Sequence, residues 1–387
     1  MRIGLSSSDV NCDSLNETRS QSELFVMLIQ NPVVGHGFAA NQIEVPGWDQ
    51  YPWVCDNNDA VARLLALCPA HQPTSLHTLV DLPGLPQGAS VWLKDETTRM
   101  GLGSFKALGA AFVIAQDAAQ VPDAAQSPWD QRLAGRCYVA ASAGNHGMSV
   151  AAGARIFGAK AIVVLAETVP PAFAERLRAK GAEVVVHGVD YAASMAKAED
   201  IAKTQGATLL SDSSWEGYVD IPWGVMQGYT QSATEVVDQL KGQIPTKIFL
   251  QAGVGGLAAA AAAVFRKAWG DRPQIIVVEP TAAPALQASI TQRRVAFADG
   301  PVSNMGRLDC KEPSVLALKS LARDADAFLT IDDEDAAKTV AMLHDAMAIH
   351  STPSGVAGLT GATLPSTPIA LSSDDRVLCI ISEGADS

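Results

Sequence analysis

Short β-branched runs alternate with helical patterns from about residue 90 to the end of the chain. The runs predicted as strands cover residues 90–94, 137–141, 161–165, 183–186, 208–211, 247–250, 275–278 and 376–381. Helices are predicted between them, including one from Pro171 to Lys180 that starts with a proline and is followed by Gly181. This alternation predicts an α/β fold with twisted, mainly parallel sheets flanked by helices.

Composition limits the classes of function. The chain has 387 residues, 48% of them hydrophobic and 18% charged, which suits a sizeable core split over two domains. A net charge of −13 without a basic run argues against binding to nucleic acid or to an anionic membrane. We expect no signal peptide, no membrane span and no metal site. The six scattered cysteines suggest reduced, mostly buried thiols in a cytoplasmic protein.

Lys106 starts the apolar, alanine-rich stretch 106–113, which predicts a buried helix. Desolvation penalises a charged amine, so a lysine is rarely placed in such surroundings without a partner. The same penalty favours a neutral, nucleophilic amine, which Schiff-base chemistry with a carbonyl cofactor requires. The alternative is a structural lysine that extends from the start of the helix to water.

A loop of small residues joins the strand 137–141 to the next helix and reads Ser142-Ala143-Gly144-Asn145-His146-Gly147. Small side chains expose backbone N–H groups beside a helix N-terminus, which is a natural site for a carboxylate. The amide of Asn145 can add one directional hydrogen bond to a ligand oxygen. A glycine-rich turn with Asn145 as the helix cap is the structural alternative.

A second loop, Gly253-Val254-Gly255-Gly256, follows the strand 247–250 and opens a very apolar helix. Glycines let backbone amides surround a phosphate at the positive end of a helix. There is a rival interpretation, because Gly253, Gly255 and Ala258 also fit a dinucleotide fingerprint. Glu279 would then be the acid that binds a ribose. On that interpretation the chain is an NAD-dependent dehydrogenase.

Two polar residues follow predicted strands. Ser382 ends the last strand, where a hydroxyl can hydrogen-bond a heteroaromatic nitrogen without protonating it, or can simply meet backbone. Asp212 closes the strand 208–211 near Trp215. An acid at that place can have a raised pKa and transfer protons, although an isolated loop aspartate often serves as a cap.

Taken together and in this order, these segments resemble the pyridoxal-phosphate enzymes of the tryptophan synthase β fold, also called fold type II, from roughly residue 75 onward. Within that group the chain is most similar to the diaminopropionate ammonia-lyases. The matching segments are 105–109, 212–218, 221–222, 226–229, 251–255 and 381–384.

The resemblance implies roles for individual residues. Lys106 would join pyridoxal 5'-phosphate covalently, Asn145 would bond its phenolic oxygen, and Ser382 would face its pyridine nitrogen. The cofactor phosphate would be held by Gly253, Val254, Gly255, Gly256 and Leu257. The substrate carboxylate would be received by Ser142, Ala143, Gly144, Asn145 and His146. Asp212 matches an active-site acid of the lyases, near the β-amino group, and it or Lys106 would protonate the leaving amine.

Two positions depart from the lyase pattern. Ala143 stands where the lyases have an aspartate that serves the D-isomer, and Pro353 stands where they have an acid. We therefore expect α,β-elimination of a small β-substituted L-amino acid, first of all 2,3-diaminopropionate, to pyruvate and ammonia. The alternative is a threonine-, serine- or hydroxyaspartate-type dehydratase on the same fold. A non-catalytic carrier is a further possibility, since a fold does not determine a function.

The resemblance also predicts the domain organisation. Residues 1–106 and 216–387 would form a larger, cofactor-binding domain, and residues 107–215 a smaller, mobile one, with the cofactor in the cleft between them. A homodimer is expected, as for most soluble oligomers.

Overall fold

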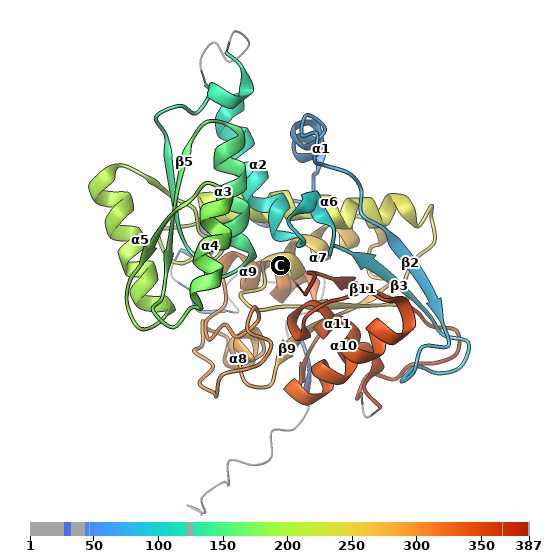
Figure 1. Cartoon of the computed structure of the whole chain (residues 1–387). Coiled ribbons are helices and arrows are strands. Elements are labelled where there is room, and N and C mark those ends of the chain that lie inside the picture. Colours follow the sequence, from blue (N-terminus) through green and yellow to red (C-terminus); the bar gives the residue numbers. More distant parts are fainter. Residues whose placement is uncertain (1–26, 32–42, 46, 122–126, 366, 386–387) are drawn as a thin grey trace, which may run out of the picture.

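Two separate sheets organise the protein (Figure 1). The computed structural model describes residues 27–31, 43–45, 47–121, 127–365 and 367–385. Within these residues, a seven-stranded sheet has the order β1-β10-β9-β8-β11-β3-β2, and a four-stranded sheet has the order β6-β5-β4-β7. Helices flank both sheets, which confirms the predicted α/β class with two mainly parallel sheets.

The larger sheet has a parallel centre and antiparallel edges. Its strands are β1 (Leu28–Gln30), β2 (Leu76–Val80), β3 (Ser90–Asp95), β8 (Lys247–Gln251), β9 (Gln274–Pro280), β10 (Ala327–Ile331) and β11 (Arg376–Ile381). The central strands pair in parallel, whereas β1 and β2 each pair antiparallel with their neighbour. The strands β1, β2 and β10 were not predicted.

The smaller sheet is parallel throughout. Its strands are β4 (Cys137–Ala141), β5 (Lys160–Leu165), β6 (Glu183–Val186) and β7 (Thr208–Leu209). The prediction of a strand over 208–211 is wrong at its end. The backbone N–H of Ser211 donates to the hydroxyl of Tyr218, at 3.1 Å, and so turns away from the sheet.

Helices connect the strands. They are α1 (Asp59–Leu65), α2 (Lys106–Ala119), α3 (Asn145–Ile156), α4 (Pro171–Ala179), α5 (Tyr191–Gln205), α6 (Asp220–Gln239), α7 (Gly256–Trp269), α8 (Ala285–Gln292), α9 (Val315–Asp324), α10 (Asp333–Met347) and α11 (Pro353–Thr363). Short 3-10 turns cover Trp48–Gln50, Arg99–Gly101 and Trp129–Gln131. In the described part of the chain, no helix combines the length and the apolarity that crossing a membrane requires.

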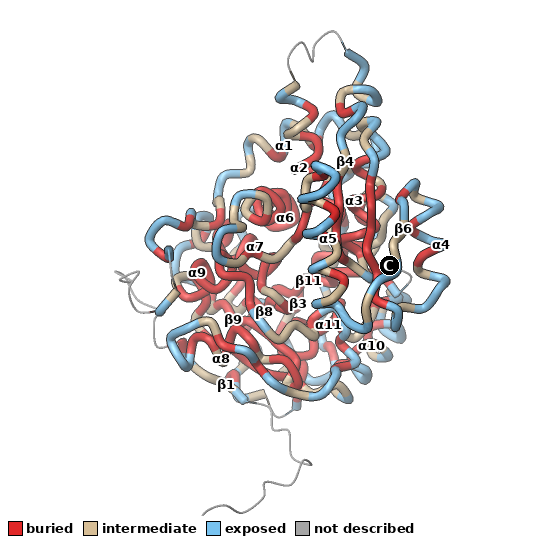
Figure 2. The backbone as a smooth tube through the Cα atoms, turned by 90° about the vertical axis from the view of Figure 1, so that its left-hand side faces the viewer, coloured by how far each residue is buried: buried red, intermediate tan, exposed pale blue. Residues whose placement is uncertain are grey.

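The central strands are buried on both faces, because helices cover both sides of the larger sheet. In β11, Leu378 and Ile380 face a core shared with α6 and α7, whereas Val377 and Cys379 face a core shared with α11. Such strands read as continuous apolar runs. Helix α7 is buried almost throughout, as Figure 2 shows, and its run of alanines allows close packing.

Helices α2 and α6 cross at two glycines, and this crossing positions the start of α2. A Cβ on Gly228 would lie 2.5 Å from the carbonyl oxygen of Leu108, and one on Gly109 would lie 2.5 Å from Cε1 of Tyr229. Only residues without side chains permit this approach. Lys106 therefore stands on a helix whose position is set by backbone-to-backbone packing.

The cysteines differ from expectation in their burial. Among the described residues Cys55, Cys68, Cys137 and Cys310 are half-buried and only Cys379 is buried, so the prediction of mostly buried thiols is wrong. All five are free thiols, and Cys12 lies outside the described residues.

Candidate active site

The end of the last strand holds the start of α2 in place. Ser104 and Glu383 form an isolated antiparallel bridge, and the N–H of Phe105 donates to the carbonyl of Ser382 at 3.1 Å. Residues that are almost 280 positions apart in the chain are therefore neighbours. Lys106 begins its helix directly beside Ser382, as the predicted site requires.

The amine of Lys106 donates a hydrogen bond to Oδ2 of Asp212. Burial alone lowers the pKa of Lys106, but the carboxylate of Asp212 outweighs burial and raises that pKa well above its usual range. Burial alone raises the pKa of Asp212, and the ammonium of Lys106 outweighs it in turn and lowers it. The expectation of a raised pKa at Asp212 is therefore wrong for the free lysine, because the acid has a cation as its partner. The alternative that Lys106 extends to water is also wrong.

Aromatic rings surround the amine and connect it to the second glycine loop. Nζ of Lys106 lies 5.3 Å from the centre of the Phe105 ring and 5.9 Å from that of Tyr229. The Tyr229 ring also lies 3.6 Å from where a Cβ on Gly256 would be. The Tyr229 ring therefore lies near both the amine and the first residue of α7.

The loop before α7 is a cradle that side chains would fill. Gly255 has a φ of +99°, and a Cβ there would lie 2.9 Å from Cβ of Ala317. A Cβ on Gly253 would lie 3.0 Å from both Sγ of Cys310 and Cα of Leu308. Glycine is needed here both for its backbone conformation and for space. Backbone N–H groups at the start of a long helix suit a phosphate.

The loop before α3 is organised by Ser142. Its Oγ accepts hydrogen bonds from the N–H groups of Gly144, at 3.2 Å, and Gly147, at 3.1 Å. Gly144 is the N-cap, so the alternative with Asn145 as the cap is wrong. Asn145 is instead the first helical residue. Burial lowers the pKa of His146, whose Nε2 lies 2.8 Å from the carbonyl oxygen of Leu210.

Two residues without an assigned role in the sequence analysis complete the site. Glu383 accepts hydrogen bonds from Nδ2 of Asn145, at 2.6 Å, and from Oγ1 of Thr352, at 2.5 Å. Nε of Arg307 lies 3.3 Å from Oε2 of Glu383. Burial raises the pKa of Glu383, and Arg307 opposes that shift. The position of Glu383 after Ser382 was a usable signal, whereas Arg307 lies in a loop without any pattern.

The predicted residues are therefore brought together, but not all in the same way. Lys106 meets Asp212, and Asn145 meets Glu383 beside Ser382. Ser382 is buried and its N–H donates to the carbonyl of Gly355 at 3.1 Å. Ala143 carries no polar side-chain atom, so it can offer only its backbone.

Glu279 does not have the role that it would have in an NAD-dependent dehydrogenase. It is fully buried, and its carboxyl oxygens accept hydrogen bonds from the N–H groups of Leu286, at 2.7 Å, and Gln287, at 2.8 Å. It therefore caps α8 and is not available to bind a ribose. The dinucleotide fingerprint loses its acidic member, and the case for an NAD-dependent dehydrogenase is removed.

Relatives of known function match most of the chain. Residues 67–383 match the family described as pyridoxal-phosphate dependent enzyme. The chain belongs to this family. It is 32% identical over 287 residues to a diaminopropionate ammonia-lyase of Salmonella typhimurium, covering 70% of this chain and 71% of the relative. A biosynthetic L-threonine dehydratase of Haemophilus influenzae is 29% identical over 280 residues, covering 70% of this chain and 48% of the relative.

Solved structures match this chain over nearly its whole length. The diaminopropionate ammonia lyase of Escherichia coli in complex with an aminoacrylate-PLP azomethine intermediate has a TM-score of 0.78 and 27% identity, covering 95% of each chain. The same enzyme in complex with D-serine has a TM-score of 0.79 and 26% identity, covering 93% of this chain and 94% of that one. The fold is therefore that of the fold type II enzymes.

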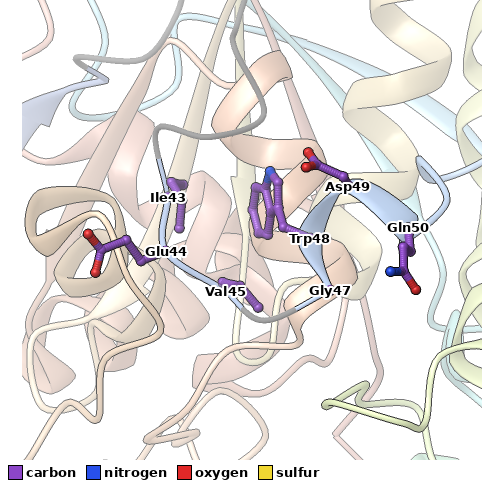
Figure 3. Close-up of a pocket in the computed structure, with 7 residues that line it drawn as sticks. All are labelled: Ile43, Glu44, Val45, Gly47, Trp48, Asp49 and Gln50. Atoms are coloured by element: carbon purple, nitrogen blue, oxygen red, sulfur yellow. The ribbon is translucent and has the colours of Figure 1, made fainter.

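The described residues fit pyridoxal phosphate. A lysine amine suits covalent attachment of its aldehyde, and the glycine cradle around Gly253 and Gly255 suits its phosphate. A separate hollow, drawn in Figure 3, belongs to a different part of the molecule and contains none of these residues. It is lined by Ile43, Glu44, Val45, Gly47, Trp48, Asp49 and Gln50.

Proposed function

We propose that this enzyme catalyses α,β-elimination of a small β-substituted L-amino acid and releases ammonia. The observation that carries the proposal is the Lys106–Asp212 pair, a lysine amine that donates a hydrogen bond to a carboxylate. When bound, pyridoxal phosphate withdraws electrons from the substrate α-carbon, and the protein selects which bond breaks. The similarity to ammonia-lyases and dehydratases supports the same reaction class.

One glycine loop would hold the cofactor and the other would hold the substrate. Gly253, Val254, Gly255, Gly256 and Leu257 would hold the cofactor phosphate through backbone N–H groups at the start of α7. Ser142, Ala143, Gly144, Asn145 and His146 would hold the substrate carboxylate at the start of α3. Asn145 and Ser382 would contact the cofactor ring, at its phenolic oxygen and its nitrogen.

Lys106 and Asp212 would move the protons. Lys106 would hold the cofactor at rest, and its freed amine would be placed to take the proton from the substrate α-carbon. Asp212 sits within hydrogen-bond reach of that amine, so it can accept a proton from it or pass one to the leaving group. Burial lowers the pKa of His146, which disfavours a competing cation beside the substrate carboxylate.

Two substrate classes follow from this chemistry. The ammonia-lyase relatives support 2,3-diaminopropionate, which with one water gives pyruvate and two ammonia molecules. Ala143 in place of the acid expected from the lyase pattern supports a β-hydroxy amino acid, which gives one keto acid and one ammonia. The ratio of ammonia to keto acid therefore separates a diamine substrate from a hydroxyl substrate.

The test is an assay of purified holoenzyme with L-2,3-diaminopropionate, L-serine, L-threonine and L-3-hydroxyaspartate, measuring ammonia and keto acid together. We expect turnover of at least one of them, and Lys106→Ala should reduce it by at least about 10³-fold while abolishing the visible absorption of the bound cofactor. Ammonia release from none of the four by cofactor-loaded protein would refute the proposed function.

We also propose the domain division predicted above, with residues 1–106 and 216–387 in the larger domain and 107–215 in the smaller, mobile one. The second sheet, β4 to β7, falls within the latter range. A cytoplasmic homodimer is proposed on the same basis. Light scattering would test the dimer, and hydrogen exchange with and without cofactor would test whether 107–215 moves as a unit.

A further inference from the structure

Tyr229 is a buried tyrosine beside both the lysine and the loop before α7. It belongs to α6, and its ring packs edge-on against that of Phe105, with the ring centres 4.8 Å apart. Nζ of Lys106 lies 5.9 Å from the centre of the Tyr229 ring. Cε2 of the same ring lies 3.6 Å from the position of a Cβ on Gly256, the first residue of α7. The ring therefore adjoins both parts of the site that cofactor binding would use.

The phenol end of this ring occupies space that Gly109 leaves open. A Cβ on Gly109 would lie 2.5 Å from Cε1 of Tyr229 and 3.0 Å from Cζ, the carbon that carries the hydroxyl. Tyr229 is only 1% exposed. Close packing of α2 against the ring therefore fixes the hydroxyl inside the protein, where it is shielded from solvent.

The hydroxyl of Tyr229 has no hydrogen-bond partner among the residues that the structure describes. Burial raises the pKa of this phenol, which keeps it a donor, and the nearby Lys106 amine opposes that rise. The amine is not a lasting partner, because it donates to Asp212 and is the atom to which the cofactor attaches. An unbonded buried hydroxyl destabilises the fold, whereas a phenylalanine would fill the same space without that penalty. A ligand that accepts a hydrogen bond from the phenol would remove the penalty.

We propose that the hydroxyl of Tyr229 donates a hydrogen bond to the phosphate of pyridoxal phosphate and so adds a side-chain donor to the backbone N–H groups at the start of α7. This inference rests on the proposed placement of the phosphate in the loop before α7. The position beside Gly256 favours the phosphate over the substrate, whose carboxylate is assigned to the loop before α3. Hydrogen bonds to a charged acceptor are among the strong ones. Tyr229 is then a cofactor-binding residue that acts on the phosphate and not on the Lys106 amine.

The experiment compares two aldehydes that differ only in the phosphate. Apo protein of wild type and of Tyr229→Phe would be titrated with pyridoxal phosphate and with pyridoxal, and attachment would be followed by absorbance. Phenylalanine keeps the ring and its packing, so the variant removes only the hydroxyl. We expect Tyr229→Phe to raise the dissociation constant of pyridoxal phosphate about 10- to 100-fold and to leave that of pyridoxal within about threefold.

Tyr138→Phe is the matched control. Tyr138 is also fully buried, but its hydroxyl already donates to Oδ2 of Asp117 at 2.7 Å. This variant should bind both aldehydes as wild type does. The two substitutions should also differ in their effect on the melting temperature of the apo protein. Tyr138→Phe should lower it because a hydrogen bond is lost, whereas Tyr229→Phe should leave it unchanged or raise it because an unbonded hydroxyl is removed.

Equal weakening of pyridoxal phosphate and pyridoxal in Tyr229→Phe would overturn the proposal, because the hydroxyl would then act on the Lys106 amine. An unchanged affinity for pyridoxal phosphate would overturn it as well, while leaving the elimination intact. The binding measurements require no turnover. Failure of every substrate in the elimination assay would therefore refute the proposed function without touching the contact between Tyr229 and the phosphate.

Discussion

The two glycine loops have the same local plan and different surroundings. Each follows a parallel strand and opens a helix, β8 to α7 in one case and β4 to α3 in the other. The loop before α7 is packed by apolar side chains, with Ala317 and Leu286 at Gly255. The loop before α3 is held by polar groups, namely Ser142 inside it and Glu383 opposite it.

This difference separates the part of the site that suits the cofactor from the part that can determine the substrate. Apolar close packing around a glycine at positive φ leaves one shape, which suits the phosphate of the family's cofactor. Polar groups at the other loop, Asn145, Glu383 and Arg307 among them, can be exchanged without rebuilding the core. Substrate preference should therefore depend on the loop before α3 and the residues facing it.

The largest effect is expected from a methyl group added in the loop before α7. Gly255→Ala forces an L-side chain into a φ of +99° and places its Cβ 2.9 Å from that of Ala317. Strain of this kind costs roughly 1–3 kcal/mol, so the dissociation constant of pyridoxal phosphate should rise about 10- to 100-fold. Absorbance titration of the apo protein measures it.

Gly144→Ala is the matched substitution on the other loop. Gly144 has extended backbone with a φ of −145°, and its added Cβ would meet Cδ and Nε of Arg307 at ordinary distances of 3.5 and 3.7 Å. Cofactor affinity should stay within about twofold, because a strain-free surface substitution changes free energies by about 0.5 kcal/mol or less. Equal weakening by the two alanines would abolish the distinction between the loops.

A middle-sized effect is expected from Asp212→Asn on the pH at which cofactor attaches. The carboxylate keeps the Lys106 amine protonated, whereas attachment requires the neutral amine. Without Asp212, burial dominates and lowers the pKa of Lys106, so the midpoint of attachment should move to lower pH. The rate at which the absorption band appears, followed from about pH 6 to pH 10, measures the shift.

Asp117→Asn is the control for this shift, because Asp117 lies at the far end of the same helix and accepts a hydrogen bond from Tyr138. It should leave the midpoint unchanged. A midpoint that does not move in Asp212→Asn would mean that Asp212 does not control the pKa of the Lys106 amine.

The smallest effect is expected from Ser142→Ala, which removes the acceptor for two N–H groups of the substrate loop. Loss of a comparable cap costs about 0.5–2 kcal/mol of the free energy of unfolding. Asp190→Ala removes a similar cap from α5, where Oδ1 accepts from the N–H of Ala193 at 2.8 Å. Chemical denaturation should show similar losses for both variants, while only Ser142→Ala should raise KM. A raised KM in both variants would mean that the effect of Ser142→Ala on substrate binding is not specific to the loop before α3.

Much of the fold follows from local patterns. The strands 247–250 and 376–381 were predicted because strands buried on both faces have uninterrupted apolar sequences. The strand 327–331 and the helices over 315–324, 333–347 and 353–363 were not predicted. The strand β7 was predicted too long, since the hydroxyl of Tyr218 takes up the N–H of Ser211.

The residues of the candidate site likewise divide into those that could be predicted from the sequence and those that could not. The glycine loops and Lys106 were recognisable because each is contiguous in the chain and follows a predicted strand or starts a predicted helix. Glu279 has the spacing from Gly253 that the rival interpretation required of a ribose acid, but its partners are the N–H groups of Leu286 and Gln287 in the first turn of α8. The contact between Arg307 and Glu383 could not be predicted, because the segment around Arg307 carries no pattern.

The amino-acid sequence by itself determined the alternation of strands and helices over much of the chain, the two glycine loops and the lysine at the start of α2, because those features depend on neighbours in the chain. Tertiary structure alone decided the partners. Lys106 meets Asp212 across 106 positions, and Asn145 meets Glu383 across 238. The sign of a pKa shift and the partners of a buried carboxylate depend on distances in space, and these exist only once the sheets and helices have packed.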